Sequence, residues 1–217
     1  MIFIATAMCS TMFSVAQVPV KHEPRHHNVF ENEYVRILDV HFGPKDTTLY
    51  HVHSTPSVFY TFTKTITTQQ LMGRPAGRGS LSSIGPPSYD SLGTPRIHRV
   101  WNDDTTWFHV MDIELTAGKP TTNPSVLQHP FLRLAFNRYL AIGYSVQLKA
   151  GDKIEIPPSA NGYLFVSQAD VNITYESGSA IQQRMMKLGH FIWAEAGKAF
   201  SIMANNSAGS FMLLQLK

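Results

Sequence analysis

Short runs of β-branched and aromatic residues, separated by glycine and proline, recur along most of the chain. Residues 34–42 read YVRILDVHF and stop at Gly43-Pro44, and residues 58–63 read VFYTFT shortly after Pro56. Runs of this length and composition favour β-strands. No stretch after residue 16 shows the 3.6-residue apolar period of a helix. The pattern therefore predicts an all-β protein built as a sandwich or barrel.

The two halves of the chain are predicted to contain similar series of strands. A segment rich in glycine and proline, 73–95, reads as a long loop, and 117–130 reads as a linker. The further strands are expected at 47–53, 65–71, 97–101, 106–115, 134–148, 152–156, 162–167, 171–175, 181–186, 190–194, 199–204 and 210–216.

A weak internal repeat relates the halves. Asn102 recurs 103 residues later as Asn205, and Asp46 recurs 106 residues later as Asp152. The matches occur in the same order in both halves, which indicates two copies of one β unit.

Composition narrows the class of protein. The chain has 217 residues, enough for one large or two small domains, and only 15% of them are charged. Such a chain can build a core. The formal charge is +3 and the basic residues are scattered, so nucleic acid is not expected as a partner.

The first sixteen residues predict a secretory signal peptide. Residues 2–16 carry no charge and end in Ser14-Val15-Ala16, a small-x-small pattern that places cleavage before Gln17. No basic residue precedes the run, so a membrane anchor stays open as an alternative, although the run is short for a span. We expect a secreted or periplasmic protein with no stable membrane span after cleavage. Cys9, the one cysteine, would leave with the signal, which excludes disulfides and Cys-bound metals.

Histidines in the predicted strand 47–53 are the strongest candidates for chemistry. His51 and His53 are two residues apart, so their rings point to the same face and can converge on one divalent ion. His98 is the best candidate for a third ligand. Residues 17–28 contain two prolines together with His22, His26 and His27, and they read as a flexible end with solvated histidines.

These residues resemble the motifs of the cupin family. Gly43, His51 and His53 are similar to the first cupin motif, and His98 and Asn102 are similar to the second. The resemblance implies two jelly-roll (double-stranded β-helix) barrels in tandem, over 17–118 and 119–217. It also carries a family-level expectation of a homodimer.

The chain departs from the family pattern in two places. The family's glutamate ligand falls at Ser57, so the resemblance implies a site with three histidines and no carboxylate. In the second unit, the repeat puts Pro157, Ser159 and Ser201 at the positions of the three histidines, so no metal is expected there.

The implied function is a centre for one divalent ion. Three neutral imidazoles can bind Fe, Zn, Ni, Cu or Mn. Ser57, Phe59 and Thr61 share one strand face and are expected to line a substrate pocket, and Asn102 is expected to lie behind the ligands or to fix a turn. One hypothesis is an Fe(II)-dependent, dioxygenase-like enzyme on a small organic substrate. The alternative is a non-catalytic cupin, either binding a small molecule or structural, whose metal site has degenerated.

Overall fold

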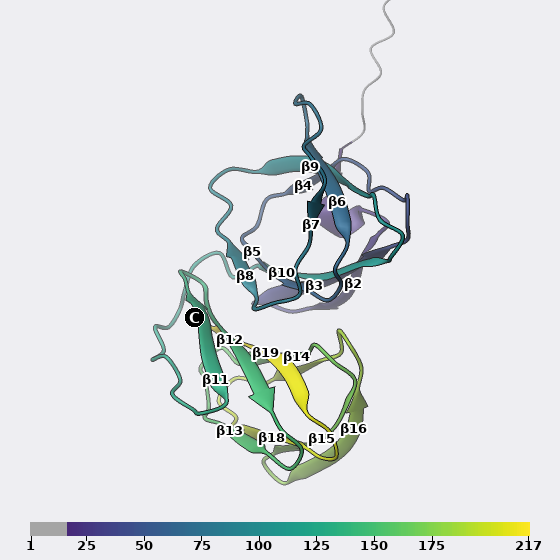
Figure 1. The fold of residues 1–217 in the computed structure, drawn as a ribbon. Coiled ribbons are helices and arrows are strands. Elements are labelled where there is room, and N and C mark those ends of the chain that lie inside the picture. The colour runs from purple at the N-terminus through teal and green to yellow at the C-terminus, as the bar shows by residue number, and fades with distance from the viewer. Residues whose placement is uncertain (1–16) are drawn as a thin grey trace, which may run out of the picture.

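The computed structural model describes residues 17–217, which form two β-barrels, one above the other in Figure 1. The predicted signal peptide, 1–16, lies outside the described residues. Strands β1–β10 form the upper barrel and β11–β19 the lower one. Among the described residues, no helix is long and apolar enough to cross a membrane.

Two five-stranded sheets form the first barrel, in the orders β1-β4-β9-β6-β7 and β2-β3-β10-β5-β8. The strands are β1 Val18–Pro19, β2 His26–Glu31, β3 Val35–Phe42, β4 His51–His53, β5 Ser57–Thr61, β6 Ile66–Leu71, β7 Ser80–Leu81, β8 Ser88–Asp90, β9 Arg96–Asn102 and β10 Phe108–Leu115. One 3-10 turn, η1 Val20–His22, precedes β2.

A five-stranded and a four-stranded sheet form the second barrel, in the orders β11-β12-β19-β14-β17 and β13-β18-β15-β16. The strands are β11 Leu132–Asn137, β12 Ala141–Leu148, β13 Lys153–Ile156, β14 Tyr163–Ser167, β15 Val171–Ser177, β16 Ala180–Met186, β17 Phe191–Ala194, β18 Phe200–Ala204 and β19 Gly209–Leu216.

The strand order of the first barrel is repeated in the second. Adding nine to the number of each strand from β2 to β10 converts the first pair of sheets into the second, with β1 left over. The register irregularity between Asn28 and Phe30 recurs between Leu134 and Phe136. The prediction of two tandem jelly-roll barrels is therefore confirmed.

Three segments differ from the sequence prediction. The stretch 134–148 is a hairpin of β11 and β12 rather than one strand, and the long loop 73–95 contains the short strands β7 and β8. Strand β2 was not predicted, because its sequence HHNVFE has few of the residues that favour strands. The unpredicted strand β2 matters because it forms one wall of the site.

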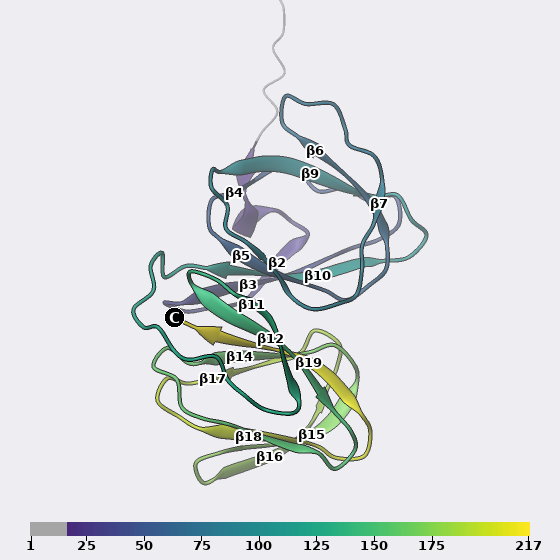
Figure 2. The same cartoon turned by 60° about the vertical axis from the view of Figure 1, so that its left-hand side comes forward.

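The barrels pack through their facing sheets. Outward residues of β3 and β10, such as Val35, Ile37 and Ile113, form one apolar cluster with Leu164 and Met212 of the second barrel. These side chains are fully buried. Burial of each contributes about 1.5–3 kcal/mol, so the two barrels stabilise one another. Figure 2 shows the same two sheets lying face to face.

The interiors of the two barrels differ. The second is filled by a large apolar cluster that includes Tyr144, Ile173 and Phe211. The cluster inside the first is small and consists of Val20, Leu38, Val40, Phe42 and Val110 with a few partly buried neighbours. The remaining interior of the first barrel is polar and hollow.

Candidate metal centre

Two paired strands bring the three predicted histidines together. In β4, His51 and His53 lie on one face because side chains alternate along a strand. Strand β4 pairs antiparallel with β9, and His51 stands opposite His98. All three residues are buried, with 1%, 3% and 8% of their surface exposed.

The three rings are close to one another. The His51 and His98 ring centroids are 4.6 Å apart, and the His53 centroid lies 5.0 Å from each of them. Nδ1 of His51 donates to the Leu49 carbonyl oxygen at 2.9 Å, and Nδ1 of His98 donates to Oε1 of Gln69 at 3.2 Å. A ring that donates from Nδ1 keeps a bare lone pair on Nε2.

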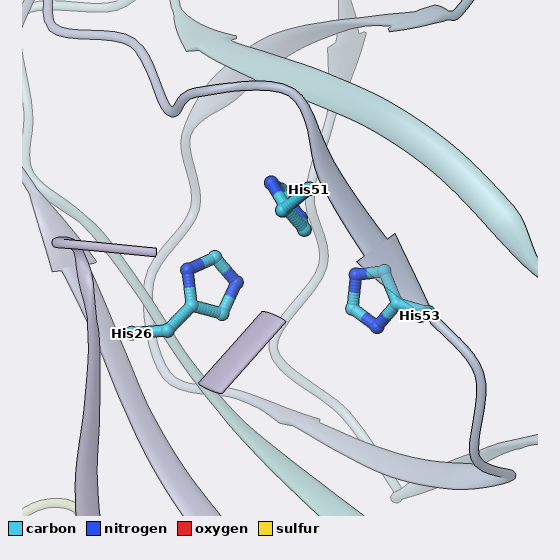
Figure 3. A group of neighbouring side chains, drawn as sticks. All are labelled: His26, His51 and His53. Atoms are coloured by element: carbon cyan, nitrogen blue, oxygen red, sulfur yellow. The ribbon is translucent and has the colours of Figure 1, made fainter. Parts of the chain in front are cut away.

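A fourth histidine joins this group from β2. The His26 centroid is 4.7 Å from that of His51 and 6.4 Å from that of His53. One ligand atom from each of His26, His51 and His53 lies within 4.8 Å of the others. Figure 3 shows these three rings grouped around one space.

The prediction of a flexible, solvated end is wrong for His26, which is 8% exposed. The carboxylate of Glu23 is buried and accepts hydrogen bonds from Nδ1 of His26 at 2.7 Å and from the backbone N–H of Leu49 at 3.0 Å. These bonds fix the N-terminal segment to the loop before β4. His22 and His27 are both exposed to solvent, in contrast to His26.

A buried carboxylate lies beside the histidines. Asp112 on β10 is 1% exposed, and its Oδ2 is 3.5 Å from Nδ1 of His53. Neither its oxygens nor this nitrogen makes a hydrogen bond of good geometry among the described residues, although the Ser57 hydroxyl lies near enough to Asp112 to lower its pKa. Burial raises the pKa of Asp112 to about 7. Asp112 contacts a ring of the group, but it is not among the residues whose ligand atoms gather there, which are His26, His51 and His53.

The burial of the rings keeps them neutral. It lowers the pKa of His51 to about 4, of His98 to about 3 and of His53 to about 2, and the charges of neighbouring histidines and Arg96 add to the effect. A histidine must be neutral to bind a metal. At neutral pH all three therefore have a free lone pair.

The rings face a cavity of about 520 Å³. Phe59 and Thr61 line it, whereas Ser57 does not; Ser57 is the first residue of β5 and stands opposite Glu114. The lining residues are His26, Val40, Phe42, Thr48, His51, His53, Phe59, Thr61, Thr67, Gln69, Ser80, Ser82, Ser88, His98, Val100, Phe108, Val110 and Asp112.

Asn102 fixes a turn. Its Nδ2 donates to the carbonyl oxygens of Phe42 at 3.3 Å and Thr106 at 2.8 Å, and its Oδ1 accepts from the N–H of Asp104 at 3.0 Å. These bonds close the connection between β9 and β10. Of the two roles expected from the sequence, Asn102 has the geometry of the turn-fixing one.

The second barrel has apolar side chains where the first has histidines. Asn102 and Ala204 each donate a backbone bond at 3.0 Å, to Asp46 and Asp152 respectively. Counting back four residues along β9 and β18 places Phe200 at the position of His98. Phe200 pairs with Ile156, as His98 pairs with His51.

The positions inferred from the sequence repeat, Pro157 and Ser201, are therefore wrong by one residue. By its pairing, Thr47 is the equivalent of Lys153. The segment from Thr47 to His51 is one residue longer than the segment from Lys153 to Ile156, so a constant offset fails for the first of these positions. By the same registers, Leu132 replaces His26 and Leu213 replaces Asp112. Pro158, rather than Ser159, follows as the counterpart of His53.

Sequence reasoning missed two residues of the group. Asp112 carried a usable signal, because it is an acidic residue inside the apolar run of β10, on the face of Val110. His26 carried none that the local sequence could reveal, since its position depends on the contact between Glu23 and a residue 26 positions later.

No protein-family model matches this sequence, and no curated protein matches it. Solved structures do resemble it. A cupin 2 conserved barrel domain protein from Leptotrichia buccalis has a TM-score of 0.55 and 10% identity, over 87% of this chain and 86% of that one. A mutant of salicylate 1,2-dioxygenase from Pseudoaminobacter salicylatoxidans has a TM-score of 0.61 and 10% identity, over 86% and 72%. YhaK from Escherichia coli has a TM-score of 0.55 and 12% identity, over 88% and 90%.

Proposed function

The chain has the cupin fold, and we propose that its N-terminal barrel binds one divalent transition-metal ion and acts as an Fe(II)-dependent, dioxygenase-like site on a small organic substrate. The observation that carries the proposal is a buried nitrogen without a partner. Nε2 of His98 is buried and makes no hydrogen bond among the described residues, although it faces a cavity lined by other imidazoles. A buried polar atom left unpaired costs about 1–3 kcal/mol, which a bound ion would remove.

The donor set suits such an ion. His51, His53 and His98 would hold it, and His26, whose Nδ1 is engaged by Glu23, would present its Nε2 as a further ligand. Imidazole suits iron, zinc, copper and nickel alike, so ligand type leaves the identity of the metal open. A ferrous ion held by three of these histidines would keep positions for a bidentate substrate and O₂, so His26 would have to stay unbound or leave when both bind.

The chain's own residues would position the substrate. Phe42, Phe59 and Phe108 offer an apolar wall, and hydroxyl and amide groups of Thr67, Ser82 and neighbouring residues offer a polar one. No lysine or arginine lines this cavity in the part of the chain that the structure describes. The charge of an anionic substrate would therefore be balanced by the metal ion. This favours substrates that chelate the metal, such as a β-diketone enolate or an ortho-hydroxy carboxylate.

A structural neighbour supports the substrate class by analogy. A structure of a salicylate 1,2-dioxygenase mutant in complex with gentisate resembles this chain with a TM-score of 0.59 and 9% identity. At that identity the likeness concerns the fold, so salicylate and gentisate enter as the first compounds to test.

Metal binding is tested by elemental analysis of protein purified without a histidine tag. We expect about one tightly held ion in the central site of the wild type and its loss in His53→Ala. Removing a residue that hydrogen-bonds a metal ligand lowers metal affinity roughly 10- to 100-fold, and removing the ligand itself should lower it further. His129→Ala, in the linker, is the matched control and should retain the metal. Equal metal content in His53→Ala and wild type would refute the site.

Catalysis is tested by oxygen consumption of the iron-loaded protein. Salicylate, gentisate, β-diketones, other phenolics and thiols form the panel, and we expect turnover of a chelating compound that His98→Ala abolishes. Bound iron without turnover of any compound would instead favour the non-catalytic binding role. These two results are separable because metal content is measured first.

We also propose that the protein is exported and loses residues 1–16. The support is the uncharged run that ends in Ser14-Val15-Ala16. N-terminal sequencing of the protein from its native host should start at Gln17. A sequence that starts at residue 1 would contradict export by cleavage.

A further inference from the structure

The outer face of the sheet β2-β3-β10-β5-β8 carries a second group of metal-ligand side chains. Along β3, Val40 and Phe42 point into the barrel, so Asp39 and His41 point out. His109 on β10 stands directly opposite His41 in the antiparallel register. The outer cluster, as we name Asp39, His41 and His109, is therefore separated from the central cavity by the thickness of the sheet.

Ligand atoms of the outer cluster are already close together. Nε2 of His109 is 2.6 Å from Oδ1 of Asp39, and Nδ1 of His41 is 3.4 Å from its Oδ2. One ligand atom from each residue lies within 4.8 Å of the other two. A tetrahedral ion with bonds of about 2.0–2.2 Å requires ligand atoms about 3.3 Å apart. Binding an ion would lengthen the 2.6 Å pair by about 0.7 Å and shorten the widest separation by up to about 1.5 Å. His41, with 42% of its side chain exposed, is free to move.

A fourth ligand is within reach. His27 pairs with Asp39 across β2 and β3, and its ring centroid lies 4.8 Å from that of His41. Burial alone would raise the pKa of Asp39, but the hydrogen bond from His109 and the charges of His109, His41 and His27 lower it. All three imidazoles thus act on the same carboxylate.

The surroundings hold one of the ligands, His109, in place. The His109 ring lies 4.7 Å from the ring of Phe62, between the two barrels. Gly189 of the second barrel approaches it so closely that a Cβ there would be 3.3 Å from Cε1 of His109. Gly189 has φ +79°, a conformation that favours glycine. The tight β16–β17 turn therefore packs against His109 and limits its movement.

We propose that Asp39, His41 and His109, with His27 as fourth ligand, form a second metal site that binds one Zn²⁺ ion. The donor set of three imidazoles and a carboxylate is one that zinc accepts in tetrahedral geometry. Four protein ligands leave no open position, so the site is structural. Bound zinc would tie β2 to β3 and β10 and, through the consecutive residues His26 and His27, fix the strand that contributes to the central site.

The test is a Zn²⁺ titration of the tag-free full chain, followed by elemental analysis after gel filtration. Wild type should hold two ions, and His41→Ala should hold one. His53→Ala should also hold one, and the His41→Ala/His53→Ala double variant should hold none. His129→Ala is the matched control and should behave as wild type. Both His41 and His129 are partly exposed, so folding is expected to survive and circular dichroism checks it.

A second variant protects the test against an indirect effect of His41. Asp39→Asn keeps the shape of the side chain but removes its charge, and it should weaken the outer site at least about tenfold while the central site is unchanged. If His41→Ala and Asp39→Asn both bind as many ions as wild type, with equal affinity, the proposal is overturned. If the central site takes no zinc, His41→Ala should lower the count from one to zero and His53→Ala should leave it at one. The two proposals can therefore fail separately.

Discussion

The two barrels share one strand order and differ in what fills them. In the first, four histidines and an aspartate surround a cavity; in the second, their counterparts include Leu132, Ile156, Phe200 and Leu213 inside a packed apolar core. The order in which the strands pair is common to both, apart from the additional β1 of the first barrel. The comparison indicates that the cupin scaffold does not need polar interior residues, so those of the first barrel are there for another purpose.

The polar interior has a cost that the second barrel offsets. Four buried atoms without hydrogen-bond partners among the described residues belong to His53, His98 and Asp112. Each such atom destabilises the fold by about 1–3 kcal/mol. The apolar cluster between the barrels contains residues of both, including Val58 and Leu214, and so supports the hollow barrel from outside.

The largest expected difference between the barrels comes from truncating equivalent residues. Phe200→Ala should destabilise the protein by about 3–5 kcal/mol, because Phe200 is 4% exposed and packs on Tyr163 and Tyr175. His98→Ala in the metal-free protein should cost about 1 kcal/mol, because the ring borders a cavity. Urea unfolding measures both, and equal losses would show that the first barrel is as well packed as the second.

Acid should weaken the first barrel. Below about pH 6.5 the unfolded chain protonates His51, His53 and His98, whose pKa values in the fold are about 4, 2 and 3. Asp112 acts in the opposite sense, because its pKa is about 7 in the fold and 3.8 in the unfolded chain. Between these two pH values the folded state binds one proton more at this residue than the unfolded state does. The unfolded state thus binds a net two protons more than the folded state. The free energy of unfolding therefore decreases as the pH is lowered, by about 2.7 kcal/mol per pH unit between about pH 6 and 5.

The measurement is urea unfolding of the metal-free protein at pH 7, 6 and 5. His98→Phe, which copies Phe200, removes one titrating ring and should reduce the slope by about 1.4 kcal/mol per pH unit. A slope that is the same in wild type and His98→Phe would contradict the assignment of the acid sensitivity to this ring.

The fold was predictable because its signals are local. Alternating β-branched and aromatic residues, with glycine and proline at the turns, define most strands, and the in-order repeat predicts the two barrels. Segment β2 and the hairpin turn between β11 and β12 were missed, because His26–Glu31 has weak strand propensity and Arg138-Tyr139-Leu140 contains no glycine or proline.

The site was predictable only where its residues share a strand or a motif. His51 and His53 are related by the period of a strand, and His98 was found from the motif of which it is part. His26 and Asp112 reach the cavity through long-range pairing, of β2 with β3 and of β10 with β3 and β5. No spacing in the sequence encodes these pairings, which depend on the closure of the barrel.

A smaller effect is expected from replacing the buried acid by its counterpart. Asp112→Leu copies Leu213 and should stabilise the metal-free protein by about 1–3 kcal/mol, because it removes a buried carboxylate that has no hydrogen-bond partner among the described residues. Asp103→Leu, at an exposed position, is the control and should change stability by less than about 0.5 kcal/mol. Destabilisation by Asp112→Leu would show that the carboxylate makes a favourable interaction with His53 or with the Ser57 hydroxyl.

The smallest predicted effect concerns the orientation of one ring. Gln69→Ala removes the acceptor of the His98 Nδ1 hydrogen bond, so the ring is free to turn and metal affinity should fall about tenfold. Gln70→Ala is a close control, because Gln70 points to the other face, where it bonds Tyr50 and Arg99, and metal affinity should not change. In the second barrel the position of Gln69 holds Tyr175, which packs against Phe200 instead of orienting a ligand. Equal affinity of Gln69→Ala and Gln70→Ala in competition with a chelator would mean that packing alone, as in the second barrel, orients His98.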